Sequence, residues 1–145
     1  MADAVVVGEN RLGRYQQEIT VGQHVLIADE PISVGGTDAG PAPFDFLMAG
    51  LGACTSMTLR MYAERKGLAL ARVSVALSHE KIEFEGKPRD RINRTITLEG
   101  DLSDEQRQRL LEIANKCPLH RALSQPLLLA STLAEEALTP DFAGL

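Results

Sequence analysis

Residues 43–67 have the sequence PFDFLMAGLGACTSMTLRMYAERKG, and this stretch decides how the rest of the chain must fold. The pattern predicts one helix whose first three turns are apolar on every side. One face carries Phe44, Leu47, Met48 and Leu51, and the other carries Phe46, Gly50, Ala53, Met57 and Met61. A helix without a polar face has to be wrapped by other parts of the fold. We therefore expect a central helix, with Cys54 near its middle.

Both ends of this predicted helix carry suitable residues. Pro43 is tolerated in a first turn, and Asp45 places a negative charge near the helix N-terminus, where the helix dipole favours it. Arg65 and Lys66 lie at the other end, where positive charge is favoured, and Gly67 suits a C-terminal cap.

The chain has 145 residues, 44% of them hydrophobic and 24% charged, which is typical of one soluble globular domain spanning 1–145. Its net charge is −5 and it has no run of Lys or Arg, which argues against nucleic acid and acidic membrane surfaces as partners. We see no secretory signal and no apolar run long enough to span a membrane. The sequence therefore predicts a cytoplasmic protein whose two cysteines are in a reducing compartment.

Short alternating runs predict the strands of the fold. They are Val5–Val7, Tyr15–Val21, Gln23–Ala28, 71–79 and 92–98. The polar segment Glu83–Asp90 is predicted as a loop or an irregular hairpin end. Three glycines and three prolines make Asp29–Pro43 a loop without regular structure, positioned directly before the helix.

The C-terminal third predicts two more helices. Ser103 and Gln106 have the capping-box form, which predicts a helix over about 104–115. The Lys116-Cys117-Pro118 sequence breaks that helix, and a short second helix begins at Pro118. Leu127–Thr132 fits either a final strand or a continued helix.

The two cysteines have different surroundings in the sequence. Cys117 lies at the N-terminus of the predicted short helix, where free N–H groups stabilise a thiolate, and His120 adds to that field. The alternative is an ordinary helix junction in which His120 only caps or packs. Cys54 by itself fits simple packing in an apolar helix, because buried free cysteines are common. The residues alone thus favour Cys117 as the more activated thiol.

A metal site is a weaker interpretation of Cys117 and His120. The chain has no C-x-x-C pair, and His24 and His79 lie on strand-like segments without companion ligands. The segment Gly35–Gly40 lacks the Gly-Lys-Ser/Thr ending of a phosphate loop. We therefore expect neither metal nor organic cofactor, and interpret the glycine-rich segment as a loop over the mouth of a pocket.

Three segments, taken in order, resemble the OsmC/Ohr family: Gly35–Leu47, Ala49–Cys54 and Cys117–His120. The resemblance extends from about Tyr15 to about Thr132 and is nearer to the OsmC-like branch than to the organic hydroperoxide resistance proteins. It implies an α+β OsmC-like fold, in which central helices pack between curved antiparallel sheets of an intertwined homodimer. The active sites then form at the dimer interface.

The resemblance also implies a thiol peroxidase that reduces organic hydroperoxides and hydrogen peroxide. In that mechanism Cys54 becomes a sulfenic acid, Cys117 condenses with it to a disulfide, and an external dithiol reduces the disulfide. The better-studied branches pair a glutamate before the helix cysteine with an arginine near the N-terminal strands. Phe44 occupies the glutamate position here. Asp45 is the nearest acid, and Arg14 matches the arginine better than Arg11 does.

The missing glutamate leaves two alternatives to an active peroxidase. One is an OsmC-like dimer that binds a hydrophobic small molecule, with the thiols no longer used. The other is a redox sensor that signals through the Cys54–Cys117 disulfide without turnover.

Overall fold

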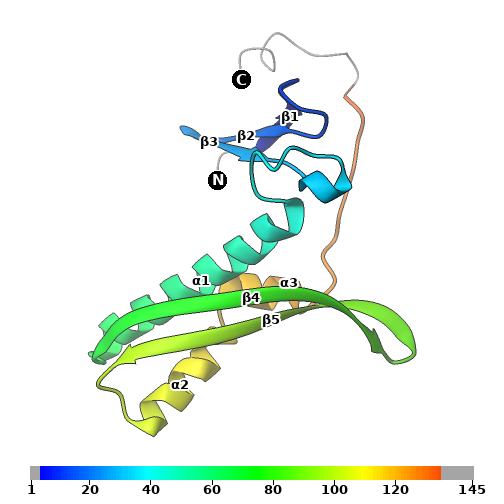
Figure 1. The fold of residues 1–145 in the computed structure, drawn as a ribbon. Coiled ribbons are helices and arrows are strands. Elements are labelled where there is room, and N and C mark those ends of the chain that lie inside the picture. The colour runs from blue at the N-terminus through cyan, green and yellow to red at the C-terminus, as the bar shows by residue number, and fades with distance from the viewer. Residues whose placement is uncertain (1–3, 135–145) are drawn as a thin grey trace. The chain divides into compact units, whose positions relative to one another are not determined.

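A computed structural model of the chain describes residues 4–134, which form a mixed α+β fold (Figure 1). The elements are β1 (Val6–Glu9), β2 (Gln17–Val21), β3 (His24–Ala28), the 3-10 helix η1 (Ile32–Val34), α1 (Pro43–Lys66), β4 (Leu70–Phe84), β5 (Lys87–Gly100), α2 (Asp104–Ala114) and α3 (Pro118–Leu123). The chain divides into two compact units. Unit 1 contains the described residues 4–43 and 128–134, and unit 2 is Phe44–Leu127.

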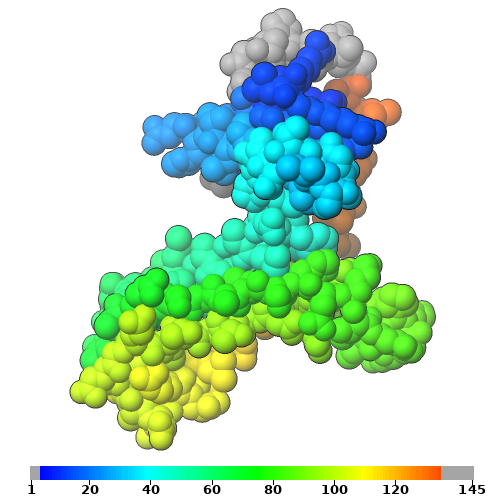
Figure 2. All heavy atoms as spheres, in the orientation of Figure 1, coloured from blue at the N-terminus to red at the C-terminus, as the bar shows by residue number. Residues whose placement is uncertain are grey.

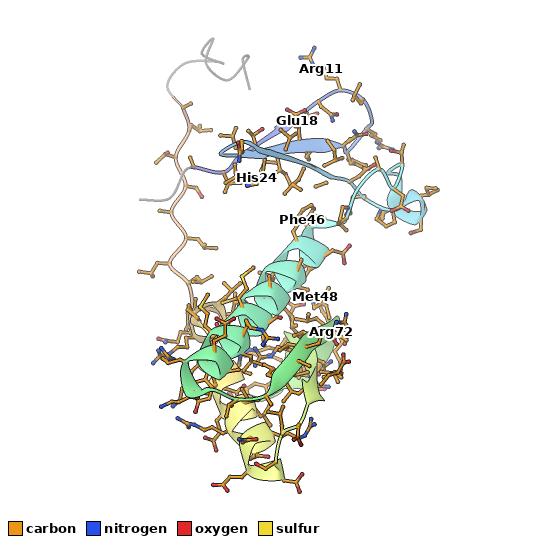
Figure 3. All side chains as sticks on the ribbon, turned by 90° about the vertical axis from the view of Figure 1, so that its left-hand side faces the viewer. Arg11, Glu18, His24, Phe46, Met48 and Arg72 are labelled. Atoms are coloured by element: carbon orange, nitrogen blue, oxygen red, sulfur yellow. The ribbon has the colours of Figure 1, made fainter. Side chains whose placement is uncertain are left out.

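Unit 1 contains a three-stranded antiparallel sheet in the order β1-β2-β3. The predicted strands are confirmed with shifted starts, since β1 begins at Val6 and β2 at Gln17. Gly22 has a φ of 56° between β2 and β3, which a tight hairpin turn requires and glycine allows. Glu18 and His24 lie in this sheet, and Arg11 projects from the β1–β2 loop (Figure 3).

The Asp29 carboxylate organises the glycine-rich loop of unit 1. It is buried and accepts hydrogen bonds from the N–H groups of Glu30, Thr37 and Ala39, at 2.8, 3.1 and 3.1 Å, and from the Thr37 hydroxyl at 2.8 Å. These bonds, led by that from Ala39, lower the pKa of Asp29 to about 2. The expectation of no regular structure was wrong at Ile32–Val34, where the loop closes into a 3-10 turn.

Two glycines of this loop lie against neighbouring backbone. A Cβ atom on Gly36 would sit 1.9 Å from the Glu30 carbonyl oxygen, and one on Gly40 would sit 2.1 Å from that of Ile27. Only glycine therefore fits at these two positions, so the glycines shape a closed loop.

Unit 2 is built on a long antiparallel hairpin of β4 and β5. The pairing places Val75 opposite Ile96 and continues to Phe84 opposite Lys87. Of the two alternatives for Glu83–Asp90, the hairpin end is confirmed, though it is regular, and the loop is wrong, because only Glu85 and Gly86 lie outside the strands. Both have positive φ, at 51° and 78°, as a two-residue hairpin turn requires. The tip projects as an arm in Figure 2, so its polar side chains face water on both sides and do not prevent strand pairing.

The core of unit 2 lies between α1, α2 and one face of the hairpin. Leu59 of α1 packs with Leu110, Ile113 and Ala114 of α2. Partly buried side chains surround this cluster: Tyr62, Leu68, Val73, Ile96, Leu98 and Leu102. The capping box predicted for α2 is confirmed, with Ser103 Oγ accepting from the Gln106 N–H at 3.1 Å and Gln106 Oε1 accepting from the Ser103 N–H at 3.0 Å.

The predicted helix over 43–67 is confirmed as α1, but in the described part of the chain only one side of it is buried. The buried stripe consists of Leu51, Gly52, Thr55, Leu59 and Ala63. Met57 and Met61, outside this stripe, remain 60% and 63% exposed. A Cβ on Gly52 would lie 2.8 Å from Leu77 Cδ1, so this glycine lets the hairpin approach the helix closely.

Both predictions for Leu127–Thr132 were wrong. These residues form neither a helix nor a strand, and Leu128 and Leu129 are 100% and 88% exposed. A strand needs a neighbouring strand for its backbone hydrogen bonds, and none of the described strands pairs with this segment. Among residues 4–134, no helix has the length and apolar character needed to cross a membrane.

Candidate functional site

The two cysteines of the chain lie together in unit 2. Cys54, near the middle of α1, is partly buried, whereas Cys117, directly before α3, is fully buried. The thiol of Cys54 is close enough to Cys117 to act on its pKa as a hydrogen-bonding group. The next residue of α1, Thr55, places its hydroxyl oxygen 3.9 Å from Cys117 Sγ. Two residues that are far apart in sequence therefore form one dithiol site.

Cys117 is the N-cap of α3. Its backbone is extended, with φ −62° and ψ 143°, because the following proline disfavours helical geometry at the preceding residue. In that conformation its sulfur accepts a hydrogen bond from the His120 N–H at 3.3 Å. The sulfur thus occupies the position where a side-chain oxygen usually caps a helix. The predicted helix start at Pro118 is confirmed.

Arg94, like Thr55, is a site residue that the sequence did not indicate. It lies on β5 opposite Leu77, and its Nη1 donates to Thr55 Oγ1 at 2.8 Å and to the Ala114 carbonyl at 3.3 Å. Its Nη2 donates to Asn115 Oδ1 at 2.9 Å. The available signal was a charged residue in the alternating row of Ile92, Ile96 and Leu98, where the sheet otherwise faces the core.

Opposing effects act on the pKa of Cys117. Burial raises it most strongly, but hydrogen bonds from the His120 N–H, the Cys54 thiol and the Thr55 hydroxyl lower it, as does the positive charge of Arg94. The lowering effects prevail, so the pKa of Cys117 lies below that of an ordinary thiol. Cys117 is therefore well placed to ionise.

His120 acts on this thiol through its backbone. Burial and, secondarily, the charge of Arg94 lower the pKa of the imidazole. The ring is therefore neutral at neutral pH, and the N–H group of His120, rather than a ring charge, supports the sulfur.

A pocket of about 380 Å³ adjoins the dithiol site. Its lining residues are Phe44, Leu47, Leu51, Asp90, Ile92, His120, Leu123 and Ser124. Phe44 stacks on the ring of His79, and His79 Nε2 lies 2.7 Å from Asp90 Oδ1. The hydrogen bond with His79 is the main reason that the pKa of Asp90 is lowered. The pocket thus has a largely apolar lining, with an ionised carboxylate in its wall.

Two other predicted site residues remain, Arg14 and Asp45. Arg14 belongs to unit 1, where its guanidinium lies 4.9 Å from the centre of the Tyr15 ring. Asp45 is in the first turn of α1, as predicted, and is exposed. In the part of the chain that the structure describes, no group of three or more His, Cys, Asp or Glu side chains is arranged to hold a metal.

Comparison with known proteins identifies a matching family model and solved structures with a similar fold. Residues 36–130 match the family model OsmC, described as OsmC-like protein. No curated protein matches the sequence. An OsmC like protein from Mycoplasma pneumoniae has a similar structure, with a TM-score of 0.72 and 19% identity over 86% of this chain and 88% of that one.

Two further structures have the same fold. A protein from Psychrobacter arcticus, described as a putative osmotic stress induced and detoxification response protein, gives a TM-score of 0.68 and 17% identity over 81% of this chain and 85% of its own. The organic hydroperoxide resistance protein OhrB of Bacillus subtilis gives a TM-score of 0.59 and 22% identity, over 84% of this chain and 90% of its own.

Proposed function

The chain belongs to the OsmC-like family, and from this premise we propose that it is a thiol peroxidase that reduces organic hydroperoxides and hydrogen peroxide. The observation that carries the proposal is that Cys54 and Cys117, the only two cysteines of the sequence, lie close together, with Thr55 beside the sulfur of Cys117. Structural neighbours described as organic hydroperoxide resistance proteins support the substrate class.

The exposure of the two thiols supports a division of roles. Cys117 has no exposed surface, whereas Cys54 is partly exposed, so a peroxide reaches Cys54 first. The Cys54 thiolate attacks one peroxide oxygen, the O–O bond breaks, and the other oxygen leaves as an alcohol after taking a proton. Cys117 then attacks the resulting sulfenic acid, forming an S–S bond and releasing the hydroxyl group as water after protonation. A dithiol reductant restores both thiols and is itself oxidised to a disulfide.

The pocket beside the site supports an organic substrate. Phe44, Leu47, Leu51, Ile92 and Leu123 give it an apolar lining. Leu51 lies one helical turn before Cys54, so the carbon chain of a hydroperoxide in this pocket would lie close to the helix that carries the thiol. Apolar contacts then favour organic hydroperoxides over hydrogen peroxide.

We propose that a second copy of the chain covers the exposed stripe of α1. Ala53, Met57 and Met61 lie at helical spacing and are exposed, and an apolar stripe of this kind can pack against itself about a two-fold axis. Arg14 and Asp45 are proposed as supporting residues of the assembled site, by resemblance to the family. Sedimentation of M57E/M61E as a monomer beside a dimeric parent would support this assembly. Equal sedimentation would contradict it.

Mass spectrometry after one equivalent of cumene hydroperoxide tests the peroxidase mechanism. We expect an intramolecular Cys54–Cys117 disulfide in the parent, no peroxide consumption by Cys54→Ser, and a trapped sulfenic acid in Cys117→Ser. If Cys54→Ser consumes peroxide as fast as the parent does, the assignment is wrong.

The apolar pocket and Phe44 also favour a second candidate, a dimer that binds a hydrophobic small molecule. Native mass spectrometry would then show a co-purified ligand, and peroxide would not be turned over with lipoyl-type or thioredoxin-type reductants. Peroxide turnover by the ligand-free protein would favour the peroxidase, and its absence would favour the binding protein.

A further inference from the structure

Arg94 carries a positive charge whose hydrogen-bond partners are all neutral. These partners are the Thr55 hydroxyl, the Ala114 carbonyl and the Asn115 side-chain oxygen. Among residues 4–134, no carboxylate forms an ion pair with it, whereas Arg72, Arg91 and Arg109 each have one. A partly buried cation without a counter-anion is costly, so an anion close to it is favoured.

Cys117 is the group that can supply this anion. Arg94 and Cys117 meet at Thr55, whose hydroxyl oxygen lies 2.8 Å from Arg94 Nη1 and 3.9 Å from Cys117 Sγ. Arg94 also binds Ala114 and Asn115, the last residues before the junction that carries Cys117. The same guanidinium therefore fixes the position of that junction and provides positive charge beside the sulfur.

The Thr55 hydroxyl can respond to the ionisation of Cys117. It has one hydrogen, which it donates to the Leu51 carbonyl at 2.7 Å, while its oxygen accepts from Arg94. Beside a neutral thiol, the hydroxyl can keep this arrangement and accept from the S–H group. Beside a thiolate, it can rotate and donate to the sulfur. Either protonation state of Cys117 is thus satisfied, and Arg94 favours the charged one.

We propose that Arg94 is a positioning residue that holds Cys117 as a thiolate, ready to attack an oxidised Cys54. In that step the Cys117 thiolate forms the S–S bond, the S–O bond of the Cys54 sulfenic acid breaks, and hydroxide leaves to become water. In the later reduction of the disulfide, a dithiol that attacks the Cys54 sulfur expels Cys117 as a thiolate, and a thiol of low pKa leaves faster. The effect of Arg94 on the ionisation of Cys117 is independent of the proposed function. The redox steps, in contrast, rest on the proposed peroxidase function.

Titration of the Cys117 thiol tests the proposal without any peroxide. In a Cys54→Ser background only one thiol remains, and its absorbance at 240 nm reports the thiolate even when the sulfur is buried. The titratable groups facing Cys117 are Cys54 of α1, Arg94 of β5 and His120 of α3, while α2 contributes the neutral Ala114 and Asn115. The serine keeps a hydroxyl donor at position 54, so differences in the Cys117 titration between variants of Arg94 report on Arg94.

Three substitutions in this background separate the charge from the packing of Arg94. Arg94→Met should raise the midpoint of the Cys117 titration by about one pH unit, which corresponds to a tenfold loss of thiolate near neutral pH. Arg94→Lys should stay closer to the unsubstituted background, because the charge remains. Arg91→Met removes an equal charge from the same strand, where the arginine pairs with the exposed Glu80, and should not move the midpoint. Equal midpoints for Arg94→Met and Arg91→Met, or equal shifts for Arg94→Met and Arg94→Lys, would overturn the proposal.

A trapping experiment in the two-cysteine protein tests the redox step. After one equivalent of cumene hydroperoxide, dimedone should label Cys54 about tenfold more in Arg94→Met than in the parent, because the slower attack by Cys117 prolongs the sulfenic acid. Labelling at the parent level would overturn the role in this step. If no protein forms a sulfenic acid at all, the proposed peroxidase fails, while the titration still decides the role of Arg94. Circular dichroism identifies any variant that does not fold. If Arg94→Met does not fold, Arg94→Lys is compared with the parent instead.

Discussion

The ring of His79 lies parallel to the ring of Phe44, with centroids 4.0 Å apart and planes inclined by 7°. His79 in turn bonds to Asp90, so an aromatic residue of α1 connects through an imidazole to a carboxylate of β5. The resemblance to OsmC/Ohr proteins implied a glutamate at position 44. Here the helix provides an apolar ring instead, and the carboxylate of the pocket wall comes from the hairpin.

Replacing Phe44 should change substrate preference. In Phe44→Ala we expect KM for cumene hydroperoxide to rise roughly tenfold, as about 1.4 kcal/mol of apolar contact is lost. KM for hydrogen peroxide should stay near the parent value, because it has no carbon chain. Phe84→Ala, at the hairpin tip, is the matched control and should leave both values unchanged. A parallel rise for both peroxides would show that Phe44 does not contact the organic group.

Removal of the Thr55 hydroxyl should weaken the thiolate of Cys117. Thr55→Val keeps the buried volume but removes one of the hydrogen bonds that lower the pKa of Cys117, and it also removes an acceptor of Arg94. We expect the 240 nm titration midpoint, measured with Cys54→Ser, to rise by about half a unit or more. Thr58→Val on the same helix serves as the control. A midpoint unchanged by Thr55→Val would exclude the hydroxyl as a support for the sulfur.

Asp29 should make the glycine-rich loop sensitive to acid. Its pKa falls from 3.8 to about 2 on folding, so the folded state favours the ionised form. The resulting stability is fully present above pH 4 and is lost as the pH falls toward 2. Asp29→Asn should therefore lower the melting temperature at pH 7 but show a smaller further loss between pH 4 and pH 2. Asp38→Asn in the same loop is the control and should follow the parent curve.

The close backbone approach at Gly36 predicts a large effect of one methyl group. Gly36→Ala would place Cβ 1.9 Å from the Glu30 carbonyl oxygen, so the loop must deform. We expect a loss of about 2 kcal/mol or more in the free energy of unfolding, measured by urea denaturation. Gly8→Ala meets no atom within 4 Å and should cost much less. Similar losses in both variants would mean that the loop relaxes freely.

Elements whose signals are local could be predicted from the order of residues. The apolar run of 43–67 predicted α1, the Ser103–Gln106 pair predicted the start of α2, and Pro118 placed Cys117 before a short helix. Each depends on residues within one or two turns, so the chain order alone reveals it. Local signals left a loop and a hairpin end open at 83–90, where the polar residues belong to a paired hairpin. They failed at 127–132, where an apolar run pairs with none of the described strands.

The thiol site is assembled by contacts between residues that are distant in the sequence. The order of residues indicated Cys54 and Cys117, but it did not reveal that the Thr55 hydroxyl lies between Arg94 and the sulfur of Cys117. Arg94 looked like an irregularity in an apolar row, because the groups that bind it come from α1 and the end of α2. A charge in a core-facing position acquires its role only from neighbours that are distant in sequence and adjacent in the fold, and pairing of that kind leaves no local pattern.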